Sequence, residues 1–345
     1  MAEFLYFLGV MAKMLLVSLG SAEGVVNDDF PKAFEQLASE ANTLRIRGNF
    51  DIDQTGGHLQ GIQPYSKNGQ NYVYMSGSSS KVAFMTLAQL GDDTKVVAVD
   101  TLMLDPYRHA GGFQIFDQYL AVGIEDNHLR NTSKVVIYDL EEVPKPWIKP
   151  LHVIDRDGEY ESVTAGAVGI TKVREHILIA VANWDCRNID FYVCPWRTFQ
   201  KGSGVFHLIQ SMDTAQMPRE NWSDPQWHSY QNLNLFTDTG GEVYMVGFGK
   251  NEKDQHVADL FLLQIATDFS EIHQPMSGME KPVGLKKLAA KTFFPSGSAD
   301  FKAGAGLGWL HDGSIGLFAC PYHIDGKSAI NIFLSKPYPH HPAGH

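Results

Sequence analysis

From about residue 44 onward, the chain consists of short apolar runs separated by Gly, Asn, Asp and Pro. Runs of this length bounded by turn residues predict β-strands; a weak helical periodicity also occurs around Leu285 to Lys291. Before the first run, Asp29 and Pro31 suit the start of a helix. Apolar side chains then recur at helical spacing, at Phe30, Phe34, Leu37 and Ala41. The pattern predicts one short amphipathic helix followed by an all-β fold.

The strand-like runs form an internal repeat. The related strings His58-Leu-Gln-Gly-Ile-Gln and His109-Ala-Gly-Gly-Phe-Gln open the first two copies, and further copies start at 164, 230 and 303. Each copy contains three apolar runs separated by tight-turn residues such as Asn-Gly and Asp-Gly. A period of roughly 50 residues is typical of four-stranded propeller blades.

A fourth run in most copies predicts an outer strand, at 96–99, 151–154, 205–209 and 288–294. The fifth copy ends near Ser335 without one. The β-like stretch Thr43-Leu-Arg-Ile-Arg-Gly-Asn-Phe-Asp precedes the first copy, so we expect it to complete the last blade and close the ring. Such closure removes a free sheet edge. The Gly-rich and Ala-rich first strands suit innermost positions, where backbones approach closely.

On its repeat count and strand order, the chain resembles a five-bladed β-propeller over roughly residues 43–336. The resemblance is to the arabinanase and fructosidase group, the small apyrases and the tachylectin-type lectins. It implies an all-β fold of four-stranded blades. The resemblance rests on repeat count and strand order and not on a catalytic motif of any of these families, so it assigns no residue a role.

The predicted regions are a leader, a helix, the propeller and a tail. Residues 1–22 are almost wholly apolar between Phe4 and Leu19 and end in small residues, as a secretory signal does. Glu3 and Lys13 depart from that pattern, and an N-terminal apolar helix is the alternative. Residues 23–42 hold the short helix, 43–336 the propeller and 337–345 a flexible tail. The signal predicts a secreted or periplasmic protein.

Composition excludes several classes of partner. The chain has 28 basic and 39 acidic residues, a formal net charge of -11, and no run of Lys or Arg, which argues against nucleic-acid binding. Its three cysteines form no CxxC pair and are expected to be free thiols. We expect no transmembrane span in the mature protein, a monomer, and a small polar or carbohydrate ligand.

Candidate site residues follow from the strand order. In a four-stranded antiparallel blade, the start of the first strand and the loop between the second and third strands lie at one end of the sheet, so these positions from all blades share the mouth of the central channel. Imidazole and carboxylate groups there are candidates for acid–base catalysis: His58, His109, Glu125 and Asp185. Candidate substrate-binding residues are Ser78, Asp126, Thr164, Asn183, Trp184, His228, Lys250, Tyr322 and His323.

Each of these assignments has a plainer alternative. Loop carboxylates such as Glu125 and Asp185 are common in an acidic chain and often only solvated. Trp184 can stack on a sugar ring or cover a blade edge. Histidines at equivalent blade starts are candidate ligands for a divalent metal ion, with His58, His109 and His228 as the set. The alternative is that these imidazoles hydrogen-bond neighbouring backbone.

Two classes of function remain. A lectin with one site per blade keeps the same contact residues in every copy, whereas here the framework repeats and the contact positions differ. This favours a single asymmetric site, as in an enzyme. We therefore predict a secreted propeller enzyme of hydrolase or lyase type, with or without a metal ion, acting on a small polar or carbohydrate-like substrate. The alternative is a noncatalytic propeller that binds carbohydrate, another ligand or a protein.

Overall fold

Strands make up most of the regular structure in the computed structural model. The structure describes residues 29–47, 57–91, 93–142, 149–266, 269, 281–310, 314–324 and 328–335. The predicted leader (1–22) and tail (337–345) lie outside these ranges. No helix in the described part of the chain is long and apolar enough to cross a membrane.

Within the described ranges, the strands group into consecutive four-stranded antiparallel units. The first comprises β2 (His58–Lys67), β3 (Gln70–Ser78), β4 (Val82–Leu90) and β5 (Lys95–Leu104). The second comprises β6 (Tyr107–Phe116), β7 (Tyr119–Asp126), β8 (Thr132–Asp139) and β9 (His152–Asp157). The third comprises β10 (Ala167–Val173), β11 (His176–Ala182), β12 (Asn188–Pro195) and β13 (His207–Asp213). The fourth comprises β14 (Ser229–Thr237), β15 (Val243–Lys250), β16 (His256–Ile265) and β17 (Val283–Phe293).

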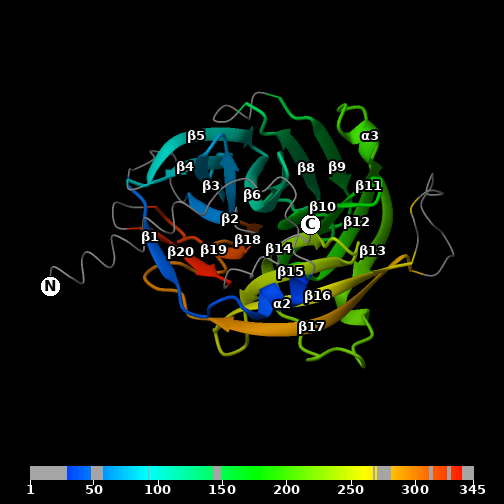
Figure 1. Ribbon diagram of the computed structural model, residues 1–345. Helices are drawn as coiled ribbons and strands as arrows, with labels where there is room; N and C mark the ends of the chain where they lie inside the picture. The colour runs from blue at the N-terminus through cyan, green and yellow to red at the C-terminus, as the bar shows by residue number, and fades with distance from the viewer. Residues whose placement is uncertain are drawn as a thin grey trace, which may run out of the picture.

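The last unit combines the two ends of the described chain. It contains β18 (Ala305–Trp309), β19 (Ile315–Ala319) and β20 (Ala329–Leu334), and β1 (Asn42–Arg45) pairs with β20 as its outer strand. The first strands of the units contact one another in the order β2, β6, β10, β14, β18 and back to β2. Figure 1 shows these strands near the middle, with β5, β13, β17 and β1 at the periphery. The arrangement is propeller-like.

Close backbone approach explains why the first strands are rich in small residues. A Cβ on Gly111 in β6 would lie 2.3 Å from the carbonyl oxygen of Gly166, and one on Gly306 in β18 would lie 2.1 Å from that of Ile62. Real Cβ atoms do not tolerate such distances, so glycine is required where inner strands of neighbouring units meet. Outside this ring, aliphatic and aromatic side chains of adjacent units pack together as the core.

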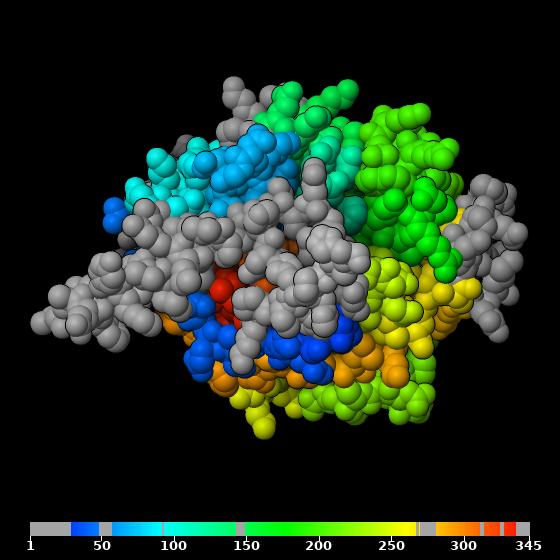
Figure 2. Space-filling view, in the orientation of Figure 1, coloured from blue at the N-terminus to red at the C-terminus, as the bar shows by residue number. Residues whose placement is uncertain are grey.

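The helix before the sheets starts as its sequence predicts. Helix α2 (Phe30–Glu35) has Asp29 as its N-cap, and the Asp29 side chain accepts the backbone N–H of Lys32. Phe30 and Phe34 are fully buried, and the ring of Phe30 stacks on Phe236 at 4.6 Å. The helix packs beside the outer strand β17, and Figure 2 shows it (dark blue) next to this strand (orange).

Two details of the strand prediction are wrong. The weak helical periodicity around Leu285 to Lys291 belongs to β17, a strand of 11 residues. The pairing of β17 with β16 skips Leu288, and this bulge interrupts the strict alternation along β17, which leaves apolar residues at a spacing that resembles a helix. The third unit begins its first strand at Ala167, because 164–166 lead into the strand instead of pairing within it.

Candidate functional site

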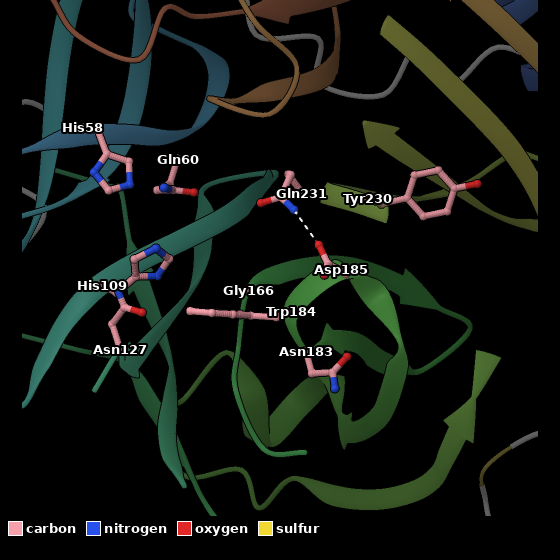
Figure 3. Close-up of a pocket in the computed structure, with 10 residues that line it drawn as sticks. All are labelled: His58, Gln60, His109, Asn127, Gly166, Asn183, Trp184, Asp185, Tyr230 and Gln231. Atoms are coloured by element: carbon pink, nitrogen blue, oxygen red, sulfur yellow. Dashed lines mark hydrogen bonds between the residues drawn. The ribbon is translucent and has the colours of Figure 1, made fainter. Parts of the chain in front are cut away.

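A polar cavity of about 260 Å³ opens where the first strands of four units begin. It is lined by His58, Gln60, His109, Asn127, Gly166, Asn183, Trp184, Asp185, Tyr230 and Gln231 (Figure 3). These residues come from the starts of first strands and from the turns between second and third strands, the two kinds of position that the strand order predicts to meet. At about 30 Å³ per water molecule, the cavity has room for one small ring-shaped ligand.

Bulges at the starts of the first strands direct two amide side chains into the cavity. The pairing of β2 with β3 skips a residue between Leu59 and Gly61, and that of β14 with β15 skips one between Tyr230 and Asn232. The skipped residues are the pocket-lining Gln60 and Gln231. A bulge changes the direction of a side chain relative to the regular alternation, which is why bulges are frequent beside functional sites.

Glu125 is fully buried behind the pocket wall and does not line the cavity. Its Oε2 accepts the backbone N–H of Ala165 at 2.7 Å, and its Oε1 accepts the indole N–H of Trp184. Nδ1 of His109 lies 3.0 Å from the same Oε1, at ion-pair distance. The structure therefore places the Glu125 carboxylate behind the wall, against Trp184 and His109, and not in the cavity lining that was predicted for it.

Asp185 is the carboxylate that the cavity exposes. It lies in a short 3-10 turn (Trp184–Cys186), with φ of 60°, in the left-handed region that non-glycine residues rarely adopt. Its Oδ1 accepts the hydroxyl of Ser229 and the amide Nε2 of Gln231 at 3.2 Å (Figure 3). Two neutral donors from β14 thus fix this carboxylate of the third unit against the fourth unit. Local backbone strain of this kind is concentrated at functional sites.

The indole of Trp184 forms one wall and is held on three sides. Its N–H is bound to Glu125, its backbone N–H donates to Thr164 Oγ1 at 3.1 Å, and the guanidinium of Arg130 lies 3.7 Å from the ring centroid. Glu161 bridges Arg130 at 2.6 Å and Arg187 at 2.8 Å. Hydrogen bonds from these two arginines lower the pKa of Glu161, so the bridge stays charged. These contacts hold the indole from the side away from the cavity lining through residues of the second and third units.

His58 lies across from His109, with ring centroids 6.2 Å apart. The hydroxyl of Ser78 lies 3.4 Å from Nε2 of His58, and the ring of Tyr322 has its centroid 6.3 Å from that of His58. Ser78 and Tyr322 therefore support His58 and are not among the lining residues.

Five other predicted substrate-binding residues lie outside the cavity lining. Asp126 accepts the backbone N–H groups of the turn that follows it, and Thr164 supports Trp184. His228 faces Asp259, with 3.7 Å between Nε2 and Oδ2. Lys250 pairs with Asp300 at 2.9 Å, and His323 is exposed. Asp126, Thr164 and His228 have partners within their own units, and Lys250 pairs with a residue that precedes the fifth unit.

The predicted set of three histidines for a metal ion is not assembled. His58 and His109 share the cavity, whereas His228 is buried beside Asp259 on the fourth unit. Among the described residues there is no group of three or more His, Cys, Asp and Glu side chains arranged to hold a metal ion.

A buried charge network supports the pocket from the fourth unit. Tyr230 donates its hydroxyl to Asp259, and Figure 3 shows that hydroxyl directed away from the other lining residues. Lys287 lies 2.7 Å from Asp259 and 3.0 Å from Asp224, with no exposure of either Lys287 or Asp259. Burial raises the pKa of Asp259 above its usual 3.8, although Lys287 acts in the opposite direction. Burial and the Asp259 carboxylate together raise the pKa of Tyr230 well above 10.0.

The residue-type survey missed five lining residues: Gln60, Asn127, Gly166, Tyr230 and Gln231. The repeat contained a signal for two of them. His-x-Gln-Gly in the first unit and Ser-Tyr-Gln-Asn in the fourth place a glutamine at the same repeat position. Both glutamines lie at the bulge of a crowded inner strand, and both side chains line the cavity.

No protein-family model and no curated protein matches the sequence. The fold is similar to solved glycoside hydrolases. A thermostable family-43 enzyme shares 10% identity at a TM-score of 0.45, over 86% of this chain and all of that chain. The catalytic domain of the Coprinopsis cinerea GH62 α-L-arabinofuranosidase shares 8% identity at a TM-score of 0.49, over 87% of this chain and 97% of that chain. An endo-arabinase from Bacteroides thetaiotaomicron shares 9% identity at a TM-score of 0.45, over 80% of this chain and 94% of that chain.

With TM-scores of 0.45–0.49 and identities of 8–10%, these similarities assign neither a family nor a role to this chain. The chemistry of the cavity therefore rests on its own side chains.

Proposed function

We propose that the chain is a closed five-bladed propeller enzyme that binds one small, hydroxylated, carbohydrate-like substrate in this cavity. The observation that carries the proposal is the lining itself. Amide side chains such as Gln60 and Gln231 both donate and accept hydrogen bonds, as sugar hydroxyls require. The indole of Trp184 offers a flat apolar wall for a ring. No Lys or Arg is among the described lining residues, so an uncharged ligand suits the cavity better than an anionic one.

His109 is the proposed general base or acid. A buried carboxylate beside Nδ1 favours the tautomer with its proton on that nitrogen, which leaves Nε2 as the basic nitrogen toward the ligand. Asp185, fixed by two neutral donors, is the carboxylate among the described lining residues. A positioned acid–base group of this kind contributes about 10²–10⁴-fold to a rate. Proton abstraction by His109 serves either hydrolysis or elimination.

A noncatalytic carbohydrate-binding propeller is the second candidate, and one observation favours it. Most glycoside hydrolases use two carboxyl groups that flank the scissile bond. Of the described lining residues, Asp185 alone is a carboxylate, and Glu125 is occupied behind the wall. If His109 does not transfer protons, the same amides and indole form a recognition site.

The test is a panel of glycosides and small polyols, with binding measured by calorimetry and products by mass spectrometry. We expect a bound member to be converted, and His109→Ala to abolish conversion while the circular dichroism spectrum is unchanged. His128→Ala is the matched control, because His128 is an exposed histidine of the neighbouring turn. Binding without any product supports the noncatalytic alternative. Absence of binding across the panel overturns both.

Export is a separate proposal that rests on the apolar residues 1–22, and these lie outside the described ranges. N-terminal sequencing of the mature protein from its native host tests it. Cleavage near residue 22 is expected, and an intact Met1 contradicts it.

A further inference from the structure

Asn232, next to the pocket, is a buried residue whose two side-chain amide atoms have no hydrogen-bond partner in the described part of the chain. The fourth position of the repeat is Gly61 in β2, Gly112 in β6 and Asn232 in β14. Asn232 is fully buried, and neither Oδ1 nor Nδ2 has a hydrogen-bond partner among the described residues. A Cβ on Gly112 would lie 2.6 Å from its Oδ1, and one on Gly61 3.1 Å. The amide therefore occupies space that the two glycines leave open.

The amides one layer further along the axis behave differently. Two residues on, Asn234 accepts the amide of Gln63 at 3.0 Å and the backbone N–H of Leu307 at 2.7 Å. Gln114 bonds both backbone groups of Leu235, each at 2.7 Å. These amides are satisfied by protein. The unsatisfied atoms of Asn232 are thus a feature of the layer nearest the pocket and not of the axis as a whole.

The chemistry of the missing partner follows from the two orphan atoms. Nδ2 needs an acceptor and Oδ1 needs a donor, so one group that both accepts and donates satisfies them together. A cation would serve only Oδ1, and an anion only Nδ2. We propose that Asn232 binds a buried water molecule beneath the pocket. The backbone oxygen of the bulged Gln231, 2.9 Å from the Cβ position of Gly112, offers that water a second acceptor.

This water would adjoin the ligand cavity. Asn232 directly follows the lining residue Gln231, and Gly61 directly follows the lining residue Gln60. Buried water that links otherwise unsatisfied polar groups is part of a fold and costly to remove. A ligand hydroxyl has the same hydrogen-bonding chemistry as the water and is the other possible occupant.

A high-resolution crystal structure of the ligand-free protein tests the proposal. We expect one spherical density peak within hydrogen-bonding distance of both Asn232 amide atoms, and its loss in Asn232→Leu. No peak overturns the proposal, and so does a peak with contacts of about 2.0–2.6 Å to several oxygens, which would be a cation. A peak found only in crystals soaked with a glycoside assigns the position to a ligand hydroxyl and overturns the water.

Thermal unfolding gives an independent result. If water satisfies Asn232, Asn232→Leu removes those hydrogen bonds and lowers Tm by several degrees. If the amide is dry, the apolar replacement relieves an unmet polar group and Tm stays the same or rises, which contradicts the proposal. Asn234→Leu is the matched control: it breaks three protein hydrogen bonds and lowers Tm in either case.

Discussion

Replacement of the Glu125 carboxylate tests how the site is held together. Glu125→Gln keeps the shape of the side chain but turns one acceptor oxygen into an NH2 group. Both carboxylate oxygens of Glu125 accept N–H donors, from Ala165 and from Trp184. Whichever way the new amide is oriented, its NH2 meets a donor and one N–H group is left buried and unpaired.

The expected cost follows from these contacts. A hydrogen bond to a charged group contributes about 1.5–3 kcal/mol, and an unsatisfied buried donor costs a further ~1–3 kcal/mol. We therefore expect Glu125→Gln to lower the free energy of unfolding by about 3 kcal/mol. At about 2.1 cal/mol/K of unfolding entropy per residue, a chain of 345 residues then loses roughly 4 °C in Tm. His109 also loses its charged neighbour, so turnover should fall by about 10²-fold or more, with a smaller change in ligand affinity.

Urea unfolding followed by tryptophan fluorescence measures the first effect, and initial rates with a substrate from the panel measure the second. Glu159→Gln, at an exposed glutamate on the connection between β9 and β10 that also contains Ala165, is the control and should change stability by less than about 0.5 kcal/mol. If Glu125→Gln is as stable and as active as the parent, the carboxylate does not hold the pocket wall and the reasoning fails.

Three further predictions concern groups away from the cavity lining. Lys287→Met should lower the free energy of unfolding by about 3–5 kcal/mol, because it leaves the buried Asp259 carboxylate without its cation. In chemical denaturation, the double variant with Asp259→Asn should recover part of this loss. Equal losses in the single and double variants would contradict the pairing. Burial lowers the pKa of His152 below its usual 6.5, so the unfolded chain binds more protons as pH falls through 6.5. Stability should drop between pH 7 and 5, and drop less in His152→Gln; identical pH profiles would refute this. A Cβ on Gly123 would lie 2.2 Å from a backbone oxygen, whereas one on Gly91 would meet nothing closer than 4.0 Å. Gly123→Ala should therefore unfold at a clearly lower temperature than the control Gly91→Ala. Matching melting curves would count against this reasoning.

Local chain properties determined the architecture. The recurring Gly-rich first run, the three apolar runs of each repeat and the turn residues between them specify four-stranded antiparallel units, because alternation, turn chemistry and backbone crowding act between near neighbours. The missing outer strand of the fifth copy also indicated that β1 pairs with β20, as it does. His58, His109, Asn183, Trp184 and Asp185 could be placed at one mouth of the channel by strand order alone.

Tertiary structure decided which polar groups remain available to a ligand. Glu125 and Asp185 occupy comparable loops in sequence, yet one is enclosed by three donor groups from the third unit and its own, while the other stays in the cavity. Bulges turned Gln60 and Gln231 into the cavity, and a salt bridge withdrew Lys250 from it. A buried polar group takes whichever partner lies within hydrogen-bonding distance, and that partner is set by the meeting of different units. The spacing of residues along the sequence does not show which side chains of different units come within hydrogen-bonding distance.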